Sequence, residues 1–349
     1  MIKINPLTIN KFRRFRSIKR GYYSCIILAV FILISLAGEL LVNSRALVVR
    51  YNGEYYFPTY GSIIPGKSFG LDYHYETNYR ELKKVFENSG TGNFVILPPV
   101  PYNPYETEIK KDSYPPLPPS IKDRHYLGTD KTGRDVAARL LYGFRIAIFF
   151  SLILLVFQYA IGVTIGCFMG YLGGRFDLVF QRIIEIWNNI PFLYAIIIVS
   201  SIIIPSFLSL LGIMIFFGWI GITWYVRTAT YREREREYVL AARALGASTS
   251  RIIMIHIIPN IISIIITFIP FSVAGGITAL TALDFLGFGL APPTPSWGQL
   301  LSEASEFNIK APWIGASVIT SMIAVLTMVT FIGEAVRESF DPKMFTTYE

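Results

Sequence analysis

The chain has 349 residues, of which 52% are hydrophobic and only 16% are charged. Soluble domains carry about 25% charged residues, so this composition excludes an ordinary soluble protein and indicates an integral membrane protein. The formal net charge is +8, which argues less for nucleic acid than for a cytoplasmic anchor beside anionic lipid. The reason is that basic residues without any acidic one gather ahead of the first apolar run: Lys3, Lys11, Arg13, Arg14, Arg16, Lys19 and Arg20.

The cysteines and histidines show neither a disulfide framework nor metal-ligand spacing. Cys25 and Cys167 fall inside apolar runs, which is typical of buried free thiols. His74, His125 and His256 lie far apart in the sequence, so we expect surface or packing roles for them and no metal site.

Six stretches are long and apolar enough to cross a bilayer, which takes about 20 residues in a helix. The first is longer than the apolar region of a signal peptide, about 7–15 residues, and indicates an uncleaved anchor. We therefore expect an all-α membrane protein with an anchor helix and a five-helix core over 144–336. The predicted transmembrane helices are residues 21–42, 144–170, 183–204, 207–226, 261–283 and 312–333.

Six crossings place both termini on one side of the membrane. The loop 227–260 carries six arginines, whereas Lys310 is the only basic residue of the opposite loop 284–311, as the positive-inside rule requires. The basic segment 43–143 is long enough to escape that rule, and we expect it outside the cytoplasm. The segments expected in the cytoplasm are the basic N-terminus, two loops and a tail: 1–20, 171–181, 227–260 and 337–349.

Residues 43–143 carry strand signals. In LVVRYNGEYYFPTY, two apolar and aromatic runs are joined by Asn52-Gly53, a cue for a type I′ hairpin. The proline-rich runs LPPVPYNPYE and SYPPLPPS favour an extended, stiff connection. We expect a small β-containing extracytoplasmic domain or lid, with a plain linker as the alternative. Its many tyrosines either form its own core or contact a partner protein.

The segment GSIIPGKS, residues 61–68, matches the letters of a phosphate-binding loop. That chemistry needs a buried strand before the loop and a helix after it, but FGLDYHYETNY follows without helical periodicity. We therefore expect no nucleotide here, and any ATP to be bound by a partner.

Glycines spaced by four mark the second predicted span. Gly162, Gly166 and Gly170, with Gly174 continuing the series, form a small-residue face that lets helix backbones approach closely. Packing inside one subunit is favoured over a dimer interface.

Other special residues lie in the third and fifth spans. Glu185 is the ionisable residue to examine near the start of the third span, unless it lies at the membrane interface. Pro191 and Pro270 interrupt their helices and permit kinks or hinges.

The stretch EYVLAARALGASTSRIIMIHIIPN, residues 237–260, is called the elbow here. Tyr238, Ala241, Ala242 and Leu245 fall at i, i+3, i+4 and i+7 and predict one narrow helix face. The adjacent alanines leave little bulk, so another surface could come very near. Upstream, REREREY alternates in sign, which indicates a solvated helix.

The second half of the elbow predicts a turn and another helix. Gly246 is placed to end the first helix, and Ser248 or Thr249 to cap a second one from 251 to 258. Pro259 with Asn260 marks its predicted end. A helix lying flat on the membrane is the alternative, but an elbow held at both ends by spans is suited to pass on motion.

These residues resemble the coupling loop of importer-type ABC transporter permeases, with paired alanines, a glycine four positions on and a final Pro-Asn. In that family's general pattern an acidic residue directly precedes the alanines. Here Glu237 stands four positions before Ala241, as in the peptide branch.

From about Tyr126 to Pro342 the chain is similar to the oligopeptide/dipeptide permeases, in YLGTDKTGRDVAARLLYGFRIAI, DFLGFGLAPPTPSWGQLL and FIGEAVRESFDP. Its first hundred-odd residues look most like the E subunit of Yej-type peptide importers.

The resemblance implies a non-enzymatic permease subunit of an ATP-driven peptide importer in a bacterial inner membrane, forming half of the pore. It implies as partners a second permease subunit, two ABC ATPase domains that bind ATP and magnesium, and an extracytoplasmic peptide-binding protein. No cofactor is expected in this chain. The alternatives are a permease for another small solute, such as nickel or a peptide-like antibiotic, and a secondary transporter acting alone. The residues implied in ATPase coupling are Glu237, Ala241, Ala242, Leu245, Gly246 and Pro259.

Overall fold

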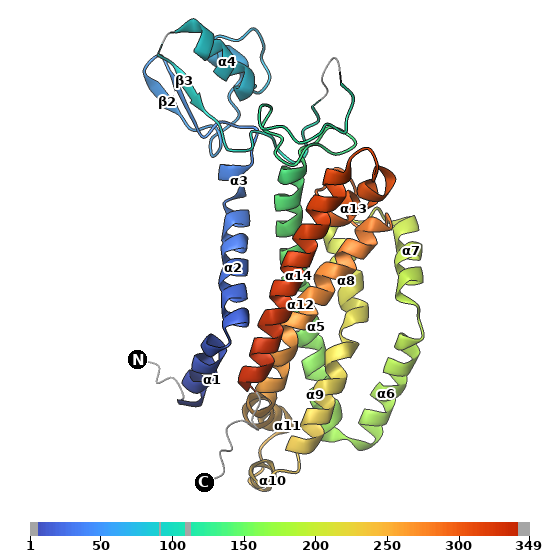
Figure 1. Ribbon diagram of the computed structural model, residues 1–349. Helices are drawn as coiled ribbons and strands as arrows, with labels where there is room; N and C mark the ends of the chain where they lie inside the picture. Colours follow the sequence, from blue (N-terminus) through green and yellow to red (C-terminus); the bar gives the residue numbers. More distant parts are fainter. Residues whose placement is uncertain (1–5, 91, 109–112, 341–349) are drawn as a thin grey trace.

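The computed structural model describes residues 6–90, 92–108 and 113–340. Long helices form a bundle that carries a small domain at one end and the short helix α10 at the other (Figure 1). Within the described residues, five helices are long and apolar enough to cross a membrane, or six if the bent pair α6 and α7 is one span. The predicted all-α membrane fold is confirmed.

The spans are α2 (Lys19–Leu36), α5 (Val136–Leu172), the bent pair α6 (Gly174–Asn188) and α7 (Phe192–Ile202), the pair α8 (Phe207–Gly218) and α9 (Ile220–Glu233), α12 (Ile258–Phe285) and α14 (Pro312–Phe340). Shorter helices are α1 (Pro6–Ser17), α3 (Gly38–Leu41), α4 (Tyr79–Ser89), α10 (Glu237–Ala244), α11 (Thr249–Arg251) and α13 (Trp297–Glu306). Helix α5 is central and packs against α9, α12 and α8, while α2 lies along α14.

Two predicted boundaries differ from the structure. Helix α5 begins at Val136 rather than at 144, because the Asp135 carboxylate caps it by accepting the Ala138 N–H at 2.8 Å. Residues 136–143 are therefore helical and do not belong to the inserted domain, which we define as residues 43–135. At the other end of the chain, α14 continues to Phe340. The rest of the predicted tail lies outside the described residues.

The third predicted span is a broken helix rather than a straight one. Helices α6 and α7 meet at an angle of 68°, and Pro191 stands as the N-cap of α7. Because proline has no N–H and restricts the residue before it, the helix cannot run through this point. The kink expected at Pro191 is present, whereas α12 continues through Pro270.

The inserted domain contains the predicted hairpin. Strands β1 (Val48–Tyr51), β2 (Glu54–Tyr56) and β3 (Phe94–Ile96) form an antiparallel sheet in the order β2-β1-β3. The turn residues Asn52 and Gly53 both have positive φ, 50° and 88°, as a type I′ turn requires. The predicted β-containing domain is confirmed.

The tyrosines of this domain divide into two groups. Tyr79 is buried with Val49, Phe69, Leu82 and Phe86 in a small core that α4 covers, and Tyr51 and Tyr56 pack against it. Exposed aromatic side chains remain on the surface: Tyr55, Phe57, Tyr60 and Tyr75. Part of the aromatic content thus builds the domain, and part is free to contact another molecule.

The segment GSIIPGKS does not have the surroundings of a phosphate loop. Its only regular structure is one 3₁₀ turn, Gly66–Phe69, and no described strand directly precedes it. A Cβ added at Gly66 would collide with the ring of Tyr73, so this glycine serves packing against that tyrosine.

The inserted domain joins α5 through a buried histidine. His125 is 1% exposed, its Nδ1 lies 2.7 Å from Asp135 Oδ2, and its Nε2 lies 2.8 Å from Glu108 Oε2. Burial alone would lower the pKa of His125, but hydrogen bonds to the two carboxylates outweigh burial and raise it to about 9. The role of this histidine is therefore an ion-paired tie between the domain and the N-terminus of α5.

Candidate functional site

The elbow lies at the end of the bundle opposite the inserted domain (Figure 1). Helix α9 ends at Glu233, and a turn over 234–236 leads into α10. The REREREY segment is thus a helix end and a turn, not the continuous helix that its charge alternation predicted. The Tyr238 hydroxyl donates a hydrogen bond to the Glu233 carboxylate across this turn. That bond fixes the start of α10 relative to the end of α9.

Helix α10 has one buried and one exposed face. Val239 and Ala242 are 0% and 8% exposed and pack into a cluster with Ile252, Ile253 and Ile257. The same cluster includes residues of α5 and α9: Cys167, Tyr171, Ile222, Val226 and Ala229. Helix α10 is therefore attached to the bundle along one side and is not a loosely tethered helix.

The predicted single face of α10 is wrong in one residue. Tyr238, Ala241 and Leu245 are exposed, Leu245 to 88%, but Ala242 points inward with Val239. At 100° per residue, residues three apart lie on the same side of a helix. Ala242 therefore faces inward with the buried Val239. The exposed residues around α10 include Glu237, Tyr238, Ala241 and Leu245, together with Leu240, Arg243 and Ala244.

Gly246 forms the turn that ends α10. Its φ is +80°, and its N–H donates to the Arg243 carbonyl at 3.0 Å while the Ala247 N–H donates to the Ala242 carbonyl at 3.1 Å. This pair of bonds is the Schellman motif, which requires a left-handed residue that glycine adopts without strain. Ser248, rather than Thr249, caps α11 by accepting the Arg251 N–H at 3.4 Å.

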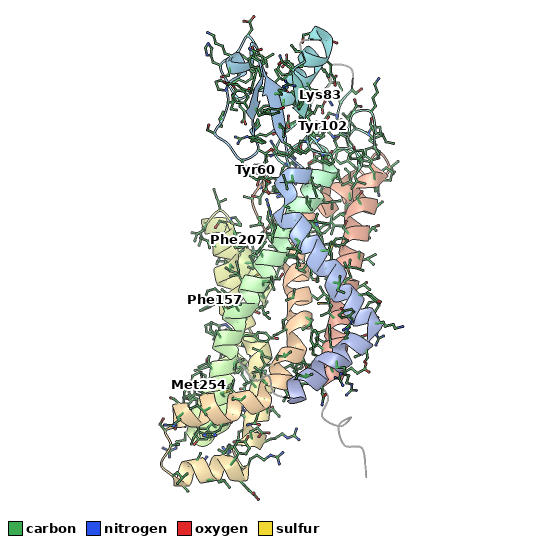
Figure 2. The ribbon with its side chains drawn as sticks, turned by 90° about the vertical axis from the view of Figure 1, so that its left-hand side faces the viewer. Tyr60, Lys83, Tyr102, Phe157, Phe207 and Met254 are labelled. Carbon is green, nitrogen blue, oxygen red and sulfur yellow. The ribbon has the colours of Figure 1, made fainter. Side chains whose placement is uncertain are left out.

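The predicted helix end at Pro259 is not present. Helix α11 passes into a π-helical turn, Ile252–Ile257, and then directly into α12, with helical backbone at both joints. Pro259 lies in the first turn of α12, directly after the π-helical turn, and the Asn260 side chain donates to the His256 carbonyl at 2.6 Å. The backbone of the second arm of the elbow is therefore continuous with α12, and this arm runs across the end of the bundle before α12 turns along it (Figure 2, where Met254 labels the arm).

The glycine series of α5 holds the elbow end of the bundle together. A Cβ at Gly162 would lie 2.5 Å from the carbonyl of Trp219, the N-cap of α9, and a Cβ at Gly166 or Gly170 would lie 2.7 or 2.6 Å from a backbone carbonyl of α9. These glycines thus pack α5 on α9 within the chain. Gly174 does not continue the series, since it follows the end of α5 with a φ of +52° and has open space around it.

Glu185 lies on an exposed face of α6 and pairs with Arg182, with Nη1 and Oε2 2.5 Å apart. A second ion pair connects α6 to α9, where Arg227 Nε and Nη2 each donate to a carboxylate oxygen of Asp177 at 2.5 Å. In the described residues no group of three or more His, Cys, Asp or Glu side chains could hold a metal ion.

Sequence reasoning missed a buried charge cluster at the opposite end of the bundle. Asp130 accepts hydrogen bonds from Arg134 and Arg139, and Glu303 of α13 lies 3.4 and 3.2 Å from the same two guanidinium groups. Arg139 also donates to Gln299 at 2.8 Å. This cluster joins the segment before α5 to α13, and the pairing across more than 160 residues leaves no signal in a single sequence.

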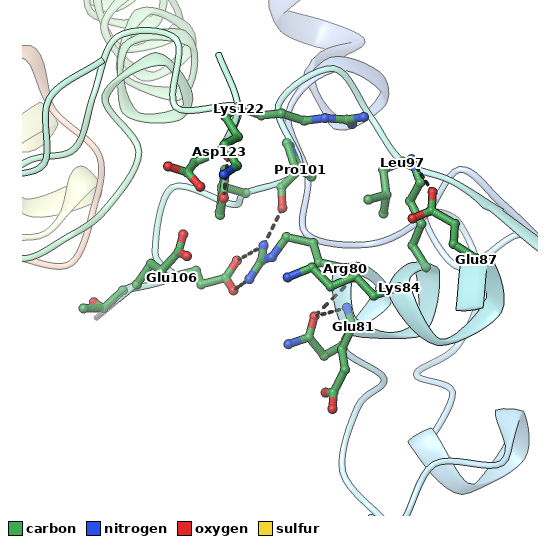
Figure 3. A pocket seen from close by; sticks show the side chains of 15 residues that line it. Arg80, Glu81, Lys84, Glu87, Leu97, Pro101, Glu106, Lys122 and Asp123 are labelled. Atoms are coloured by element: carbon green, nitrogen blue, oxygen red, sulfur yellow. Dashed lines mark hydrogen bonds and ion pairs between the residues drawn. The ribbon is translucent and has the colours of Figure 1, made fainter. Parts of the chain in front are cut away.

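A cavity of about 520 Å³ lies within the inserted domain and is lined by charges of both signs. In it, Arg80 of α4 donates to the Glu106 carboxylate and to the Pro101 carbonyl (Figure 3). These bonds fix α4 against the extended segment that leads toward α5.

Comparisons with known proteins agree with this architecture. Residues 162–346 match the family model described as "Binding-protein-dependent transport system inner membrane component". The chain is 40% identical to the inner membrane ABC transporter permease protein YejE of Escherichia coli, over 98% of this chain and 99% of that protein. It is 36% identical to the peptidoglycan transport system permease protein YejE of Agrobacterium fabrum, over 97% and 94%.

The similarity to the dipeptide permeases is confined to part of the chain. The dipeptide transport system permease protein DppC of Bacillus subtilis is 34% identical over 65% of this chain and 71% of that protein. The resemblance seen in the sequence motifs is confirmed. The chain belongs to the family of inner-membrane components of binding-protein-dependent transport systems and is a multi-pass permease of the ABC importer type.

Proposed function

We propose that this chain forms half of the translocation pore of a peptide importer and that its elbow is the contact for cytoplasmic ATPases. The observation that carries the proposal is the construction of the elbow. One face of α10 is fixed to the bundle through Val239 and Ala242, and the other face is exposed through Ala241 and Leu245. An exposed apolar side chain beside a small residue suits a protein surface that approaches closely.

The elbow is also built to transmit movement. Because α11, the π-helical turn and α12 are continuous, a displacement of α10 by an ATPase passes into a membrane span without an intervening flexible loop. A ligand that moves a two-state equilibrium from 1:99 to 99:1 must bind the favoured state more tightly than the other by about 5.5 kcal/mol. In this proposal ATP binding in the partner ATPase domains supplies that difference, and the chain itself binds neither ATP nor magnesium.

Charge supports an orientation with the elbow and both termini in the cytoplasm. The turn and helices of the elbow region are rich in arginine, as cytoplasmic loops are, and the inserted domain then faces the binding protein. The substrate class rests on the relatives, whose names specify dipeptide, oligopeptide and peptidoglycan transport. A second, different permease subunit completes the pore in this proposal.

The test is a cysteine cross-link in the assembled complex. In a Cys25→Ser background, which removes the exposed native thiol, Ala241→Cys should cross-link to an ATPase subunit through a short bismaleimide. Lys310→Cys, exposed at the opposite end of the bundle, is the matched control and should not. Equal cross-linking of both, or none from position 241 in a complex that hydrolyses ATP, would contradict the coupling role.

A further inference from the structure

One span of the bundle is a broken helix. The backbone of the third span is broken between α6 and α7 at 189–191, whereas the fourth span, α8 and α9, keeps helical backbone through Trp219. Inside a bilayer each unsatisfied backbone group costs several kcal/mol, so broken helices occur there only where protein buries them or where they line a water-filled cavity.

A cavity of about 410 Å³ lies beside this break. Its wall includes Trp187, Asn188 and Pro191 from the break, Gly218 from the end of α8, and Gln158 of α5. A smaller cavity of about 190 Å³ shares Gln158 and Gly218 and extends toward α12, where the Tyr159 and Ser272 hydroxyls lie 2.8 Å apart. In Figure 2, Phe157 stands between Phe207 and Met254 along the bundle, so its neighbour Gln158 lies at middle depth.

Gln158 provides the polar centre of this double cavity. Its Nε2 donates to the Met214 carbonyl at 2.9 Å, and its Oε1 accepts no hydrogen bond from any described residue. Gly218 makes room for it, since a Cβ there would collide with the Gln158 amide. Asn188, exposed at the edge of the helix break, adds a second amide.

The lining of both cavities matches a peptide main chain. None of the described lining residues is acidic, basic or histidine; the walls are amides, hydroxyls, aromatic rings and aliphatic groups. A side-chain amide can donate to and accept from a peptide bond, and aromatic rings give contact area for apolar side chains. A site without fixed charge does not discriminate between acidic and basic peptides.

We propose that the cavity centred on Gln158 is a transit site in which the permease holds the main chain of the moving peptide. The inference deepens the proposed function and rests on it. It assigns to this chain a substrate contact halfway across the membrane, made by an amide beside the broken third span.

The first test uses the complete complex, with partner permease, ATPases and binding protein, in proteoliposomes. Gln158→Leu keeps the size of the side chain but removes its amide. Peptide uptake should fall about fivefold, the scale of one lost neutral hydrogen bond, while ATP hydrolysis stimulated by loaded binding protein stays within about twofold. Thr164→Val is the matched control, because the Thr164 hydroxyl on the same helix bonds only to the Ala160 carbonyl, and uptake should be unchanged.

Unchanged uptake in Gln158→Leu would overturn the inference while leaving peptide import intact. Absence of ATP-dependent uptake in the unmodified complex would instead contradict the proposed function. A second measurement does not depend on substitution of Gln158. Asn188→Cys in the Cys25→Ser background should react with a charged maleimide, and loaded binding protein with a non-hydrolysable ATP analogue should slow that reaction. No reaction with the charged reagent would show that lipid fills the cavity and would refute the transit site.

Discussion

Replacing Gly246 by valine perturbs the elbow at a single backbone position. The φ of +80° at this residue is left-handed, and a side chain there strains the backbone. An added Cβ would meet no atom within 4 Å, so the substitution creates no clash and fills no cavity. Its effect is therefore confined to the angle between α10 and α11.

The size of the effect follows from the backbone. A left-handed conformation costs an L-residue about 1–2 kcal/mol, and more for a β-branched one. If the turn opens to escape this strain, the two Schellman bonds are lost, each worth about 1 kcal/mol. In either case the elbow geometry seen here is disfavoured by about 1–2 kcal/mol, which is about a 5- to 30-fold change in the ratio of this geometry to its alternatives.

We expect the peptide uptake of the reconstituted Gly246→Val complex to fall within that 5- to 30-fold range, while the chain inserts and assembles normally. Gly246→Asn, which tolerates the left-handed region better, should lose least, and Gly246→Ala should lie between. Gly212→Val in α8 is the control, since Gly212 has the same free space but no positive φ. Uptake equal to the unmodified complex in Gly246→Val, or a loss in Gly246→Asn as large as in Gly246→Val, would refute the reasoning.

Three further predictions concern packing, pH and the domain surface. Gly166→Val should destabilise the chain by about 1–3 kcal/mol, because the new Cβ would lie 2.7 Å from the Thr223 carbonyl, which cannot move aside. The measurement is the thermal unfolding midpoint in detergent, which should fall. An unchanged midpoint would contradict the α5–α9 contact. The pKa of His125 is raised from about 6.5 to about 9, so its ion pairs contribute fully below about pH 6.5 and are lost as pH rises through about 9. The unmodified protein should lose up to about 3 kcal/mol of its free energy of unfolding over this pH window, and the His125→Gln variant should not. Parallel curves of unfolding free energy against pH for the two proteins would refute this. Replacing exposed Tyr60 and Tyr75 by serine should reduce the ATP hydrolysis that the binding protein stimulates. The domain should stay folded, because its core does not include these two side chains. Full stimulation in the double variant would exclude a contact between these tyrosines and the binding protein.

The spans and the hairpin could be predicted because their signals are local. Runs of apolar residues give the spans, and Asn52-Gly53 gives a type I′ turn whose two positive φ angles are present. The start of α5 was missed because Arg139 interrupts the apolar pattern. Its charge is neutralised by Asp130 and Glu303, and one of these partners lies far away in the sequence.

The elbow shows the same limit on a smaller scale. The turn at Gly246 follows from glycine chemistry, and the structure has it. The inward rotation of Ala242 follows from Val239 packing on Ile252 and Ile257, a tertiary contact that helix periodicity alone does not specify. Pro259 indicated a helix end, but it stands directly after a π-helical turn that passes into α12 with helical backbone, so the helix continues through it.

If this chain serves an importer driven by ATP, accumulation of peptide in proteoliposomes depends on ATP and on the partner proteins. The complete complex should concentrate a labelled peptide only when ATP, magnesium and the loaded binding protein are all supplied, and the chain alone should neither transport peptide nor hydrolyse ATP. Accumulation driven by a proton or sodium gradient in the absence of ATP, or by this chain without ATPase partners, would contradict the account.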